Sequence, residues 1–440
     1  MKQVNSCGAL SETVLQTDHA AIYANQLLAD LGETVRVVEA ADHPAIAYRR
    51  SGLLQTTGLM LPLPLVSHAD GALMALKAIS PNSENLPDYG SQLLGERARL
   101  RETIRQGRLC AGGYGRLIDT VDGRIALNLV REDDWDLIPA WFEDYVEDWD
   151  GIETLAAQKE ADYLVKRASE IGLAVAKDEL PPKRDHWFSI QQFKKASCQT
   201  PLIVDLSGLW AGPLASSLLG LTGAQVIKIE SPARPDGMRF GHEGFYDLLN
   251  AGKECVALNF RETEDLKHLK TLLHKADIVI EASRPRALRQ LGIMAEDFVS
   301  QKPGKVWARL TAYGQSENRI GFGDDVGISA GLATIMERAH NQPCFVGDAI
   351  ADPINGLHLA LALQASLNQG GGMVIDLSMR DTLRYAMGDV PQDLVQTAKE
   401  WQAIADEDNM PLYAMRTAQG EVKPLAQIMR SGYDYSECGS

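Results

Sequence analysis

At 440 residues, of which 45% are hydrophobic and 23% charged, the chain has the composition of an ordinary globular protein with room for two or three domains. Its formal net charge of −16 argues against a general nucleic-acid binder, because neutralising phosphates requires a basic face. That charge does not exclude an anionic small ligand, since a local cluster of Arg and Lys can oppose the overall sign.

The cysteines and the apolar segments indicate the class of protein. Six cysteines are spread over the chain and none forms a Cys-x-x-Cys pair, which favours reduced thiols over a disulfide framework or a metal site. The stretch 1–16 has no apolar core of signal-peptide length, and no run of about 18 apolar residues occurs anywhere. We therefore expect a soluble, cytoplasmic protein with no bound metal and no membrane contact.

The first elements predict a faint copy of a later part of the chain. A helix-turn-strand pattern in residues 1–60 has the same spacing as a pattern after residue 210, which indicates a degenerate β-α-β repeat. The alternative is chance similarity between two ordinary helix-turn-strand units. Residues 61–111 mix helical and loop patterns and are predicted to be a helical connector. The matching positions are Leu27, Leu28, Gly32, Val35 and Glu39 in the first copy and Leu218, Leu219, Gly223, Val226 and Glu230 in the second.

Residues 112–185 are predicted to form a small α+β domain. Apolar and polar residues alternate from 124 to 129 as in a strand, and an apolar stripe then follows at helical spacing. Residues 186–199, after a proline pair and two basic residues, are interpreted as a linker. The stripe consists of Trp135, Ile138, Trp141, Phe142 and Tyr145.

Residues 200–390 have the clearest architecture. Short apolar runs of strand length alternate with helical patterns, which predicts a doubly wound, Rossmann-like parallel sheet and hence an α/β fold. Ligands of such sheets usually bind beyond the carboxyl ends of the strands. Residues 391–440 are predicted to be a C-terminal tail. The predicted strands are 202–206, 226–229, 278–280, 306–310 and 373–377.

The same region resembles a known family. The segment 202–230, LIVDLSGLWAGPLASSLLGLTGAQVIKIE, is similar to the opening of family III CoA-transferases, which include formyl-CoA transferase, carnitine CoA-transferase and the α-methylacyl-CoA racemases. The shared order is strand-Asp-Leu, Ala-Gly-Pro, helix, then Gly-Ala-x-Val-Ile-Lys-Ile-Glu. Further similar segments follow in register, and their order makes the resemblance specific. They are residues 249–253, 276–292, 310–315 and 347–358.

The N-terminal half departs from the family pattern. Residues 117–177 resemble the family's small domain, which ordinarily follows the opening of the large domain. Here this segment precedes the well-kept opening and follows the degraded one. The resemblance therefore implies a truncated first copy, a small domain, and then a better-kept second copy.

The resemblance implies that Asp352 is the covalent nucleophile, because it falls in the segment that holds the family's catalytic aspartate. A free Asp has a pKa of about 3.9, so it is ionised at neutral pH and can attack a thioester carbonyl. It precedes Pro353 and a predicted helix, whose N–H groups could stabilise a developing oxyanion. The alternative is that Asp352 only caps that helix.

Other residues are implied to bind coenzyme A. Lys253 and Tyr313 fall on family positions that contact it, and a group of arginines follows the predicted strands, where the phosphates would lie. The alternative for each arginine is a solvated surface residue. Trp210 and the pair 282–283 differ from the family residues at those positions. The remaining predicted contacts are Ala211 and Gly212 in the Ala-Gly-Pro turn, with Arg234, Arg239, Arg284 and Arg286.

The resulting hypothesis is a CoA-transferase that moves coenzyme A between an acyl-CoA and a carboxylic acid through an aspartyl intermediate. Coenzyme A is then part of the substrate, and no further cofactor is expected. The resemblance implies a homodimer, which is interlocked in family members. One alternative is a non-catalytic CoA-binding homologue. A racemase or isomerase is disfavoured, because the racemases' Gly-His-Asp motif is Gly323-Asp324-Asp325 here, without the histidine.

Overall fold

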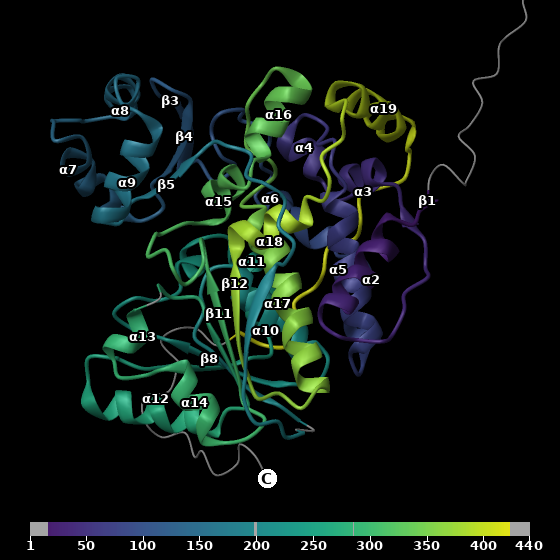
Figure 1. Ribbon diagram of the computed structural model, residues 1–440, viewed down its shortest axis with the longest axis vertical. Helices are drawn as coiled ribbons and strands as arrows, with labels where there is room; N and C mark the ends of the chain where they lie inside the picture. The colour runs from purple at the N-terminus through teal and green to yellow at the C-terminus, as the bar shows by residue number, and fades with distance from the viewer. Residues whose placement is uncertain (1–15, 198–199, 285, 423–440) are drawn as a thin grey trace, which may run out of the picture.

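A computed structural model describes residues 16–197, 200–284 and 286–422 of the chain. Its largest unit is a seven-stranded sheet of strand order β6-β12-β11-β10-β7-β8-β9. A separate three-stranded sheet with its own helices stands at the upper left of Figure 1, and a layer of N-terminal helices lies at the right. The predicted α/β class, with a mostly parallel sheet and a smaller α+β unit, is confirmed.

The apolar runs predicted as strands form the centre of the large sheet. Each is buried because helices cover both faces, as is usual for parallel strands. The sequence analysis missed one further parallel strand, β9, at the edge. The parallel strands are β7 (Leu202–Asp205), β8 (Gln225–Glu230), β9 (Glu254–Ala257), β10 (Ile278–Glu281), β11 (Val306–Thr311) and β12 (Met373–Ser378).

Alternate side chains of the strands separate two cores. On one face, Ile203 and Ile278 pack with α10 (Ala211–Leu221) and α17 (Ala351–Asn368). On the other face, Val204 packs with two helices at the lower left of Figure 1. These helices are α12 (Thr263–Lys275) and α14 (Ala295–Gln301), and shorter helices of this region are α11 (Glu243–Asn250), α13 (Ala287–Gln290), α15 (Gly323–Ser329), α16 (Leu332–His340) and α18 (Met379–Ala386).

The predicted linker 186–199 is wrong in part, because it contains a strand of the large sheet. β6 (Phe188–Gln192) pairs antiparallel with β12, with Phe188 opposite Leu377. Four of its five residues are exposed, so the segment lacks the apolar pattern that marks the other strands. The predicted tail also holds structure, since α19 (Leu394–Glu407) packs against other helices through buried positions. Residues 423–440 of that tail lie outside the described part.

The small unit matches its prediction in the sheet and differs in the apolar stripe. The predicted strand at 124–129 is β4 of an antiparallel three-stranded sheet. Trp141 is fully buried, whereas Tyr145 is 76% exposed because the chain turns at Glu143 (φ +58°). The elements are β3 (Gly115–Asp119), β4 (Arg124–Asn128), η2 (Glu132–Leu137), α7 (Ile138–Phe142), α8 (Trp149–Ala156), α9 (Ala161–Ile171) and β5 (Ala174–Lys177).

Within residues 16–60, the described part of the predicted β-α-β repeat, only the helix of the repeat forms. Residues 1–15 of that prediction lie outside the described residues. α2 (His19–Asp30) forms, but the segment after Gly32 is irregular and leaves Val38 88% exposed. The two-residue strands β1 and β2 pair antiparallel with each other, apart from the large sheet. The other elements of this layer are β1 (Gln16–Thr17), β2 (Ala41–Asp42), α3 (Pro44–Arg50), α4 (Leu53–Thr57), α5 (Leu65–Ile79), η1 (Ser83–Asn85) and α6 (Gln92–Leu100).

The described residues lack two features. None of the helices there has both the length and the apolar character needed to cross a bilayer. No group of His, Cys, Asp and Glu side chains in the same ranges has the arrangement of a metal site. Cys110, Cys255 and Cys344 are buried free thiols.

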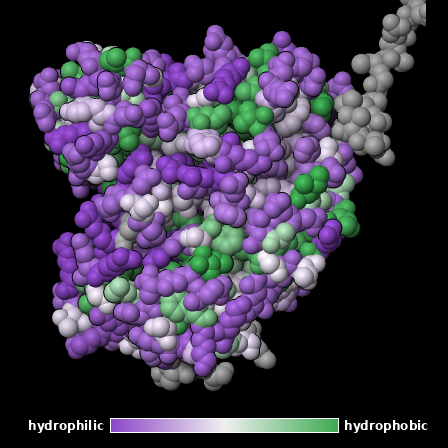
Figure 2. Space-filling model, viewed as in Figure 1, coloured by the Kyte–Doolittle hydropathy of each residue, from purple (hydrophilic) through white to green (hydrophobic). Residues whose placement is uncertain are grey.

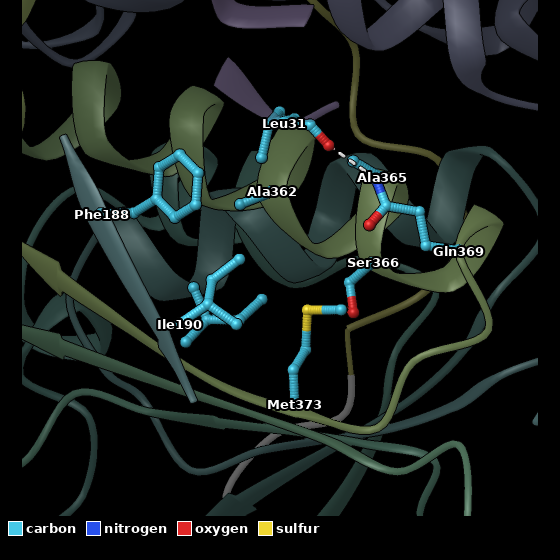
Figure 3. A pocket seen from close by; sticks show the side chains of 9 residues that line it. Leu31, Phe188, Ile190, Ala362, Ala365, Ser366, Gln369 and Met373 are labelled. Carbon is cyan, nitrogen blue, oxygen red and sulfur yellow. Dashed lines mark hydrogen bonds between the residues drawn. The ribbon is translucent and has the colours of Figure 1, made fainter. Parts of the chain in front are cut away.

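A small apolar hollow lies between α17, β6 and β12 (Figure 3). Phe188, Ile190 and Met373 line it together with the last turns of α17. Asp352 is at the other end of the 18-residue α17, and a helix rises about 1.5 Å per residue, so the hollow is remote from the predicted nucleophile.

Candidate active site

Asp352 lies in the first turn of α17, between the N-termini of two helices. Its Oδ1 accepts a hydrogen bond of 3.4 Å from the N–H of Ala211, the first residue of α10. The N-cap of α17 is Ile350, so Asp352 is not the simple helix cap of the alternative interpretation. The residue is partly exposed. Its carboxylate therefore faces a helix N-terminus, which favours negative charge.

Gly323, at the start of α15, makes the closest approach to this carboxylate. A Cβ at this position would lie 2.0 Å from Oδ2 of Asp352 and 2.5 Å from the carbonyl oxygen of Ala349. Carbon atoms cannot approach so closely, so only glycine allows α15 to pack here.

Replacing Gly323 with alanine should therefore displace the Asp352 carboxylate and reduce any reaction that depends on it by at least about tenfold, as misplacement of a reacting group does. Gly327→Ala in the same helix is the matched control, because a Cβ there meets only ordinary contacts at 3.5 Å. Steady-state rates and unfolding midpoints of both variants check the prediction. Equal rates for the two variants would contradict the proposed importance of this close contact.

Three further aspartates lie around Asp352, and all are buried. Asp324 accepts a 2.8 Å bond from the N–H of Ala349, and Asp325 accepts a 3.1 Å bond from the Tyr313 hydroxyl. Asp348 accepts two hydrogen bonds from the guanidinium of Arg97 in α6, one of them 2.7 Å long from Nε.

Burial is the main cause of the shifted acidities in this cluster. It raises the pKa of Asp352 to about 6, of Asp325 to about 6 and of Asp324 to about 7. The positive charge of Arg97 opposes this rise at Asp352, as does the hydrogen bond from Ala211. Asp352 is consequently ionised at neutral pH, but less readily than an exposed aspartate.

Two non-glycine residues near the carboxylate have left-handed backbone conformations. Leu209 (φ +65°) directly precedes the N-cap of α10, and Ala349 (φ +48°) lies three residues before Asp352. An aspartate holds each of them: Asp236 accepts a 2.9 Å bond from the N–H of Leu209, and Asp324 holds Ala349 as described above. Strained backbone of this kind persists where the surroundings fix it, and it is frequent at functional sites.

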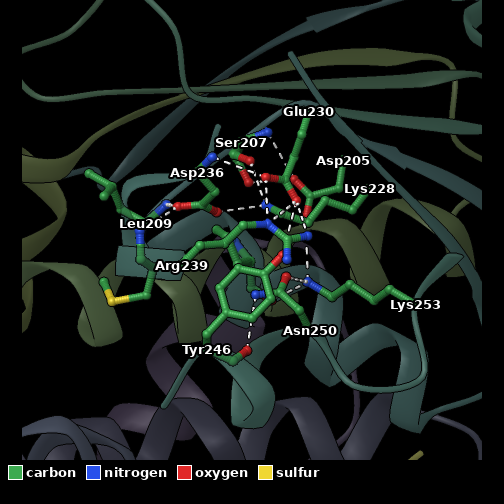
Figure 4. A network of polar contacts seen from close by, with 12 residues as sticks. Asp205, Ser207, Leu209, Lys228, Glu230, Asp236, Arg239, Tyr246, Asn250 and Lys253 are labelled. Atoms are coloured by element: carbon green, nitrogen blue, oxygen red, sulfur yellow. Dashed lines mark hydrogen bonds and ion pairs between the residues drawn. The ribbon is translucent and has the colours of Figure 1, made fainter. Parts of the chain in front are cut away.

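A buried ionic network fixes the turn before α10 (Figure 4). Lys228 Nζ lies 2.8 Å from Asp236 and donates to the carbonyl oxygen of Ser207 at 3.0 Å. Gly212 allows α10 to approach the same turn, because a Cβ there would lie 2.1 Å from Ser207 Oγ. The network therefore holds in place the segment whose end carries the Ala211 N–H.

Three residues predicted to contact coenzyme A have partners within the protein. Lys253 is buried and its Nζ donates to Ser216 Oγ (2.7 Å) and the Pro213 carbonyl (2.8 Å); burial lowers its pKa to about 8. Arg239 is paired with Glu230 at 2.7 Å, and its guanidinium lies 4.4 Å above the Tyr246 ring. Tyr313 is buried against Asp325. These partners hold the three side chains in place. Their contact with coenzyme A stays a prediction.

The other predicted arginines are exposed and lie in one neighbourhood. Arg234 follows β8, and Arg284 and Arg286 follow β10. The pKa of Arg284 is lowered by partial burial and then by the charges of Arg131, Arg234 and Arg286, so each of these three is near enough to act on Arg284. Figure 2 shows an indentation at the left, between the lobe of the small sheet and the lower lobe, with hydrophilic residues around it.

The sequence analysis missed two arginines, Arg131 beside the exposed arginines and Arg97 beside Asp352. Arg131 comes from the small unit, where its guanidinium is held by Asp134 and by the carbonyl of Gly172 (2.6 Å). Arg97 comes from the predicted connector, and its guanidinium also lies 4.8 Å from the centre of the Trp210 ring. No motif in the surrounding sequence marked either arginine, because each reaches its place from a segment that is distant in sequence.

Comparison with known proteins shows similarity in the second half of the chain. The model of CoA-transferase family III matches residues 201–426. Succinyl-CoA:glutarate CoA-transferase of Homo sapiens is 29% identical over 237 residues, covering 50% of this chain and 54% of the relative. Succinyl-CoA–D-citramalate CoA-transferase of Chloroflexus aurantiacus is 28% identical over 191 residues, covering 40% and 48%.

Among solved structures, the crystal structure of Rv3272 from M. tuberculosis has a TM-score of 0.39 and 29% identity, covering 44% of this chain and 56% of that chain. The chain thus spans about half the length of the curated relatives it matches.

Proposed function

Since the chain belongs to CoA-transferase family III, we propose that it moves coenzyme A from an acyl-CoA to a carboxylic acid, with Asp352 as the covalent carrier. The observation that supports this most is the position of Asp352, a partly exposed residue whose carboxylate lies 3.4 Å from the Ala211 N–H. Relatives named for succinyl-CoA and dicarboxylic acids support the same reaction class.

In the proposed reaction, a carboxylate oxygen of Asp352 attacks the thioester carbonyl and displaces CoA thiolate, which gives a mixed anhydride. The thiolate then attacks the aspartyl carbonyl and releases the donor acid, leaving coenzyme A on Asp352 as a thioester. An incoming carboxylate reverses both steps and departs as the new acyl-CoA. The N–H of Ala211, at the head of α10, is suited to stabilise the oxyanion that develops on the aspartyl carbonyl.

The exposed arginines are proposed to bind the phosphates of coenzyme A. Replacing Arg284 and Arg286 together with alanine should raise the KM for acyl-CoA about 10- to 100-fold with little change in kcat, because phosphate contacts contribute uniform binding. The effect should weaken at high salt. Lys302→Ala is a control, since this exposed lysine precedes β11 and so lies toward the amino ends of the parallel strands, whereas the two arginines follow the carboxyl end of β10. A large fall in kcat with unchanged KM would contradict the assignment.

Label exchange tests the reaction directly. The protein is incubated with an acyl-CoA and the labelled free acid of the same acyl group, over a panel that includes dicarboxylic acids. We expect label to enter the thioester with the native chain and not with Asp352→Ala, which should still bind acyl-CoA.

A non-catalytic CoA-binding homologue is the second candidate, and the observation that favours it is that the chain spans only about half the length of its relatives. Binding of coenzyme A without exchange over the whole panel would support this candidate. Loss of the α-proton of the acyl group without exchange would support the isomerase. The homodimer implied by the resemblance stays a prediction.

A further inference from the structure

The short helix α15 lies between the small unit and the candidate nucleophile, because it packs against β4 and β5 on one side and against α17 on the other (Figure 1). Its first three residues each make a different contact. Gly323 packs directly against the Asp352 carboxylate. Asp324 accepts the N–H of Ala349, which precedes the N-cap of α17, and Asp325 faces the small unit. One turn of helix therefore connects the small unit with the carboxylate and with the backbone before it.

The contact between α15 and the small unit is a buried hydrogen bond. Asn128 is the last residue of β4, and its Nδ2 donates to Oδ1 of Asp325 at 3.1 Å. Both side chains are buried. The Oδ1 of Asn128 has no hydrogen-bond partner among the described residues. The amide is therefore turned so that its donor, and not its acceptor, meets the carboxylate.

Asp325 has two further donors, which lie outside the small unit. These are the N–H of Phe322 (2.8 Å) and the hydroxyl of Tyr313 (3.1 Å). The small unit also holds Tyr313, because Arg319 lies 3.9 Å above its ring and donates to the Val175 carbonyl of β5 at 3.0 Å. Burial raises the pKa of Asp325 to about 6, and its three hydrogen bonds oppose that rise. The position and the charge of Asp325 therefore both depend on the small unit.

Adhesion of the small unit to α15 does not require this hydrogen bond. One face of the small sheet packs on its own helices, and the alternate side chains of the other face join an apolar cluster with α15 and α16. Apolar contact is non-directional, whereas a buried hydrogen bond fixes the positions of its two groups. The amide therefore adds direction to an interface that is already adhesive. The cluster consists of Cys110, Leu117, Ala126, Ala176, Ile328, Ala333 and Phe345.

We propose that Asn128 is a positioning residue for the nucleophile. By holding Asp325, it fixes the start of α15 and thereby the place of the Asp352 carboxylate. The proposal rests on the proposed function of Asp352 and adds a part for the small unit in the reaction. Asn128 acts through α15, and it contacts neither the nucleophile nor the substrate.

Asn128→Leu tests the proposal in the full chain, because leucine has the same branched shape and no donor. We expect kcat for CoA transfer to fall about 10- to 100-fold while the KM for acyl-CoA stays within about twofold of the native value, because only the placement of a reacting group changes. Asn128→Ala, which is smaller, should give the same result. Thr334→Val is the matched control and should keep the native kcat, since its hydroxyl joins the small unit to α16 through Asp178 (2.8 Å). A native kcat in both Asn128 variants would overturn the proposal.

A double-mutant cycle separates an effect through Asp325 from a general loss of packing. Asp325→Asn removes the buried charge that the Asn128 amide holds. In that background, adding Asn128→Leu should reduce kcat by less than about threefold further, because coupled residues are not additive. An additional loss as large as that of the single Asn128→Leu variant would show that Asn128 does not act through Asp325.

Hydrogen exchange in the absence of acyl-CoA tests the positioning separately from the chemistry. Asp324, the neighbour of Asp325, holds the N–H of Ala349. Exchange of this amide should be at least about tenfold faster in Asn128→Leu, because a loosened α15 opens locally more often, and native-like in Thr334→Val. Unchanged exchange in Asn128→Leu would overturn the proposal. A failure of the CoA-transfer assay with the native chain would instead count against the proposed function, since this exchange needs no substrate.

Discussion

Asp352→Asn should reduce CoA transfer by at least about a thousandfold, because an amide cannot form the mixed anhydride on which the proposed reaction depends. The variant should fold normally, since asparagine has the same shape and its amide oxygen can accept the bond from Ala211. Transfer rates, acyl-CoA binding and unfolding midpoints check the three parts of this prediction. Asp352→Ala is a second variant, which excludes slow return of a carboxylate by deamidation.

The native rate should depend on pH through the same carboxyl group. With a pKa of about 6 at Asp352, the rate should fall about tenfold per unit as the pH decreases below 6, because only the ionised form attacks. The effect on stability has the opposite sign. A carboxyl whose pKa is raised by folding binds protons more tightly in the native state, so its contribution to stability is present at low pH and is lost as the pH rises from about 4 to 6. A flat rate between pH 5 and pH 7 would count against this assignment.

Arg97→Met should have the second large effect, because it removes the partner of a fully buried carboxylate. Asp348 has no exposed side-chain surface, and its two hydrogen bonds from Arg97 would be lost. Breaking a buried ion pair on one side typically costs about 3–5 kcal/mol in the free energy of unfolding. The substitution should also shift the acidic limb of the rate profile to higher pH, since the Arg97 charge lowers the pKa of Asp352.

Two controls separate stability from the electrostatic effect on the site. Arg97→Met combined with Asp348→Asn removes the unpaired charge and should recover part of the lost stability. Arg97→Lys keeps a positive charge, so it should retain the native position of the acidic limb more closely than methionine. If the methionine variant were less stable but its rate profile were unshifted, Arg97 would be a purely structural residue.

The central strands could be predicted from sequence because burial on both faces leaves uninterrupted apolar runs, as at 202–206 and 278–280. β6 could not, since this edge strand is mostly exposed and its residues carry no such pattern. The strand expected near Val35 also did not form. In the second copy, the segment with the same pattern is β8, which pairs with neighbouring strands, whereas in the first copy Val38 is exposed to solvent. Local propensity was the same, and the tertiary surroundings decided the outcome.

In the site, the order of motifs identified Asp352 and the Ala-Gly-Pro turn, and the structure brings them together. The protein partners of Lys253 and Arg239 could not be predicted, because a sequence does not distinguish a paired charge from a surface charge that meets a ligand. Arg97 was missed because its role depends on α6 lying beside the α17 N-terminus, a contact between segments about 250 residues apart. These contacts join segments that are distant in sequence, so the spacing of residues along the chain does not predict them.

Intact mass measurement of the chain after incubation with an acyl-CoA tests the central claim most directly. With no acceptor acid present, the account predicts that the native chain gains the mass of coenzyme A, bound as a thioester. The added mass should map to Asp352, and Asp352→Asn should gain none. The account would be contradicted by a native chain that binds acyl-CoA and transfers coenzyme A without ever carrying this added mass. It would also be contradicted if the added mass were on another residue.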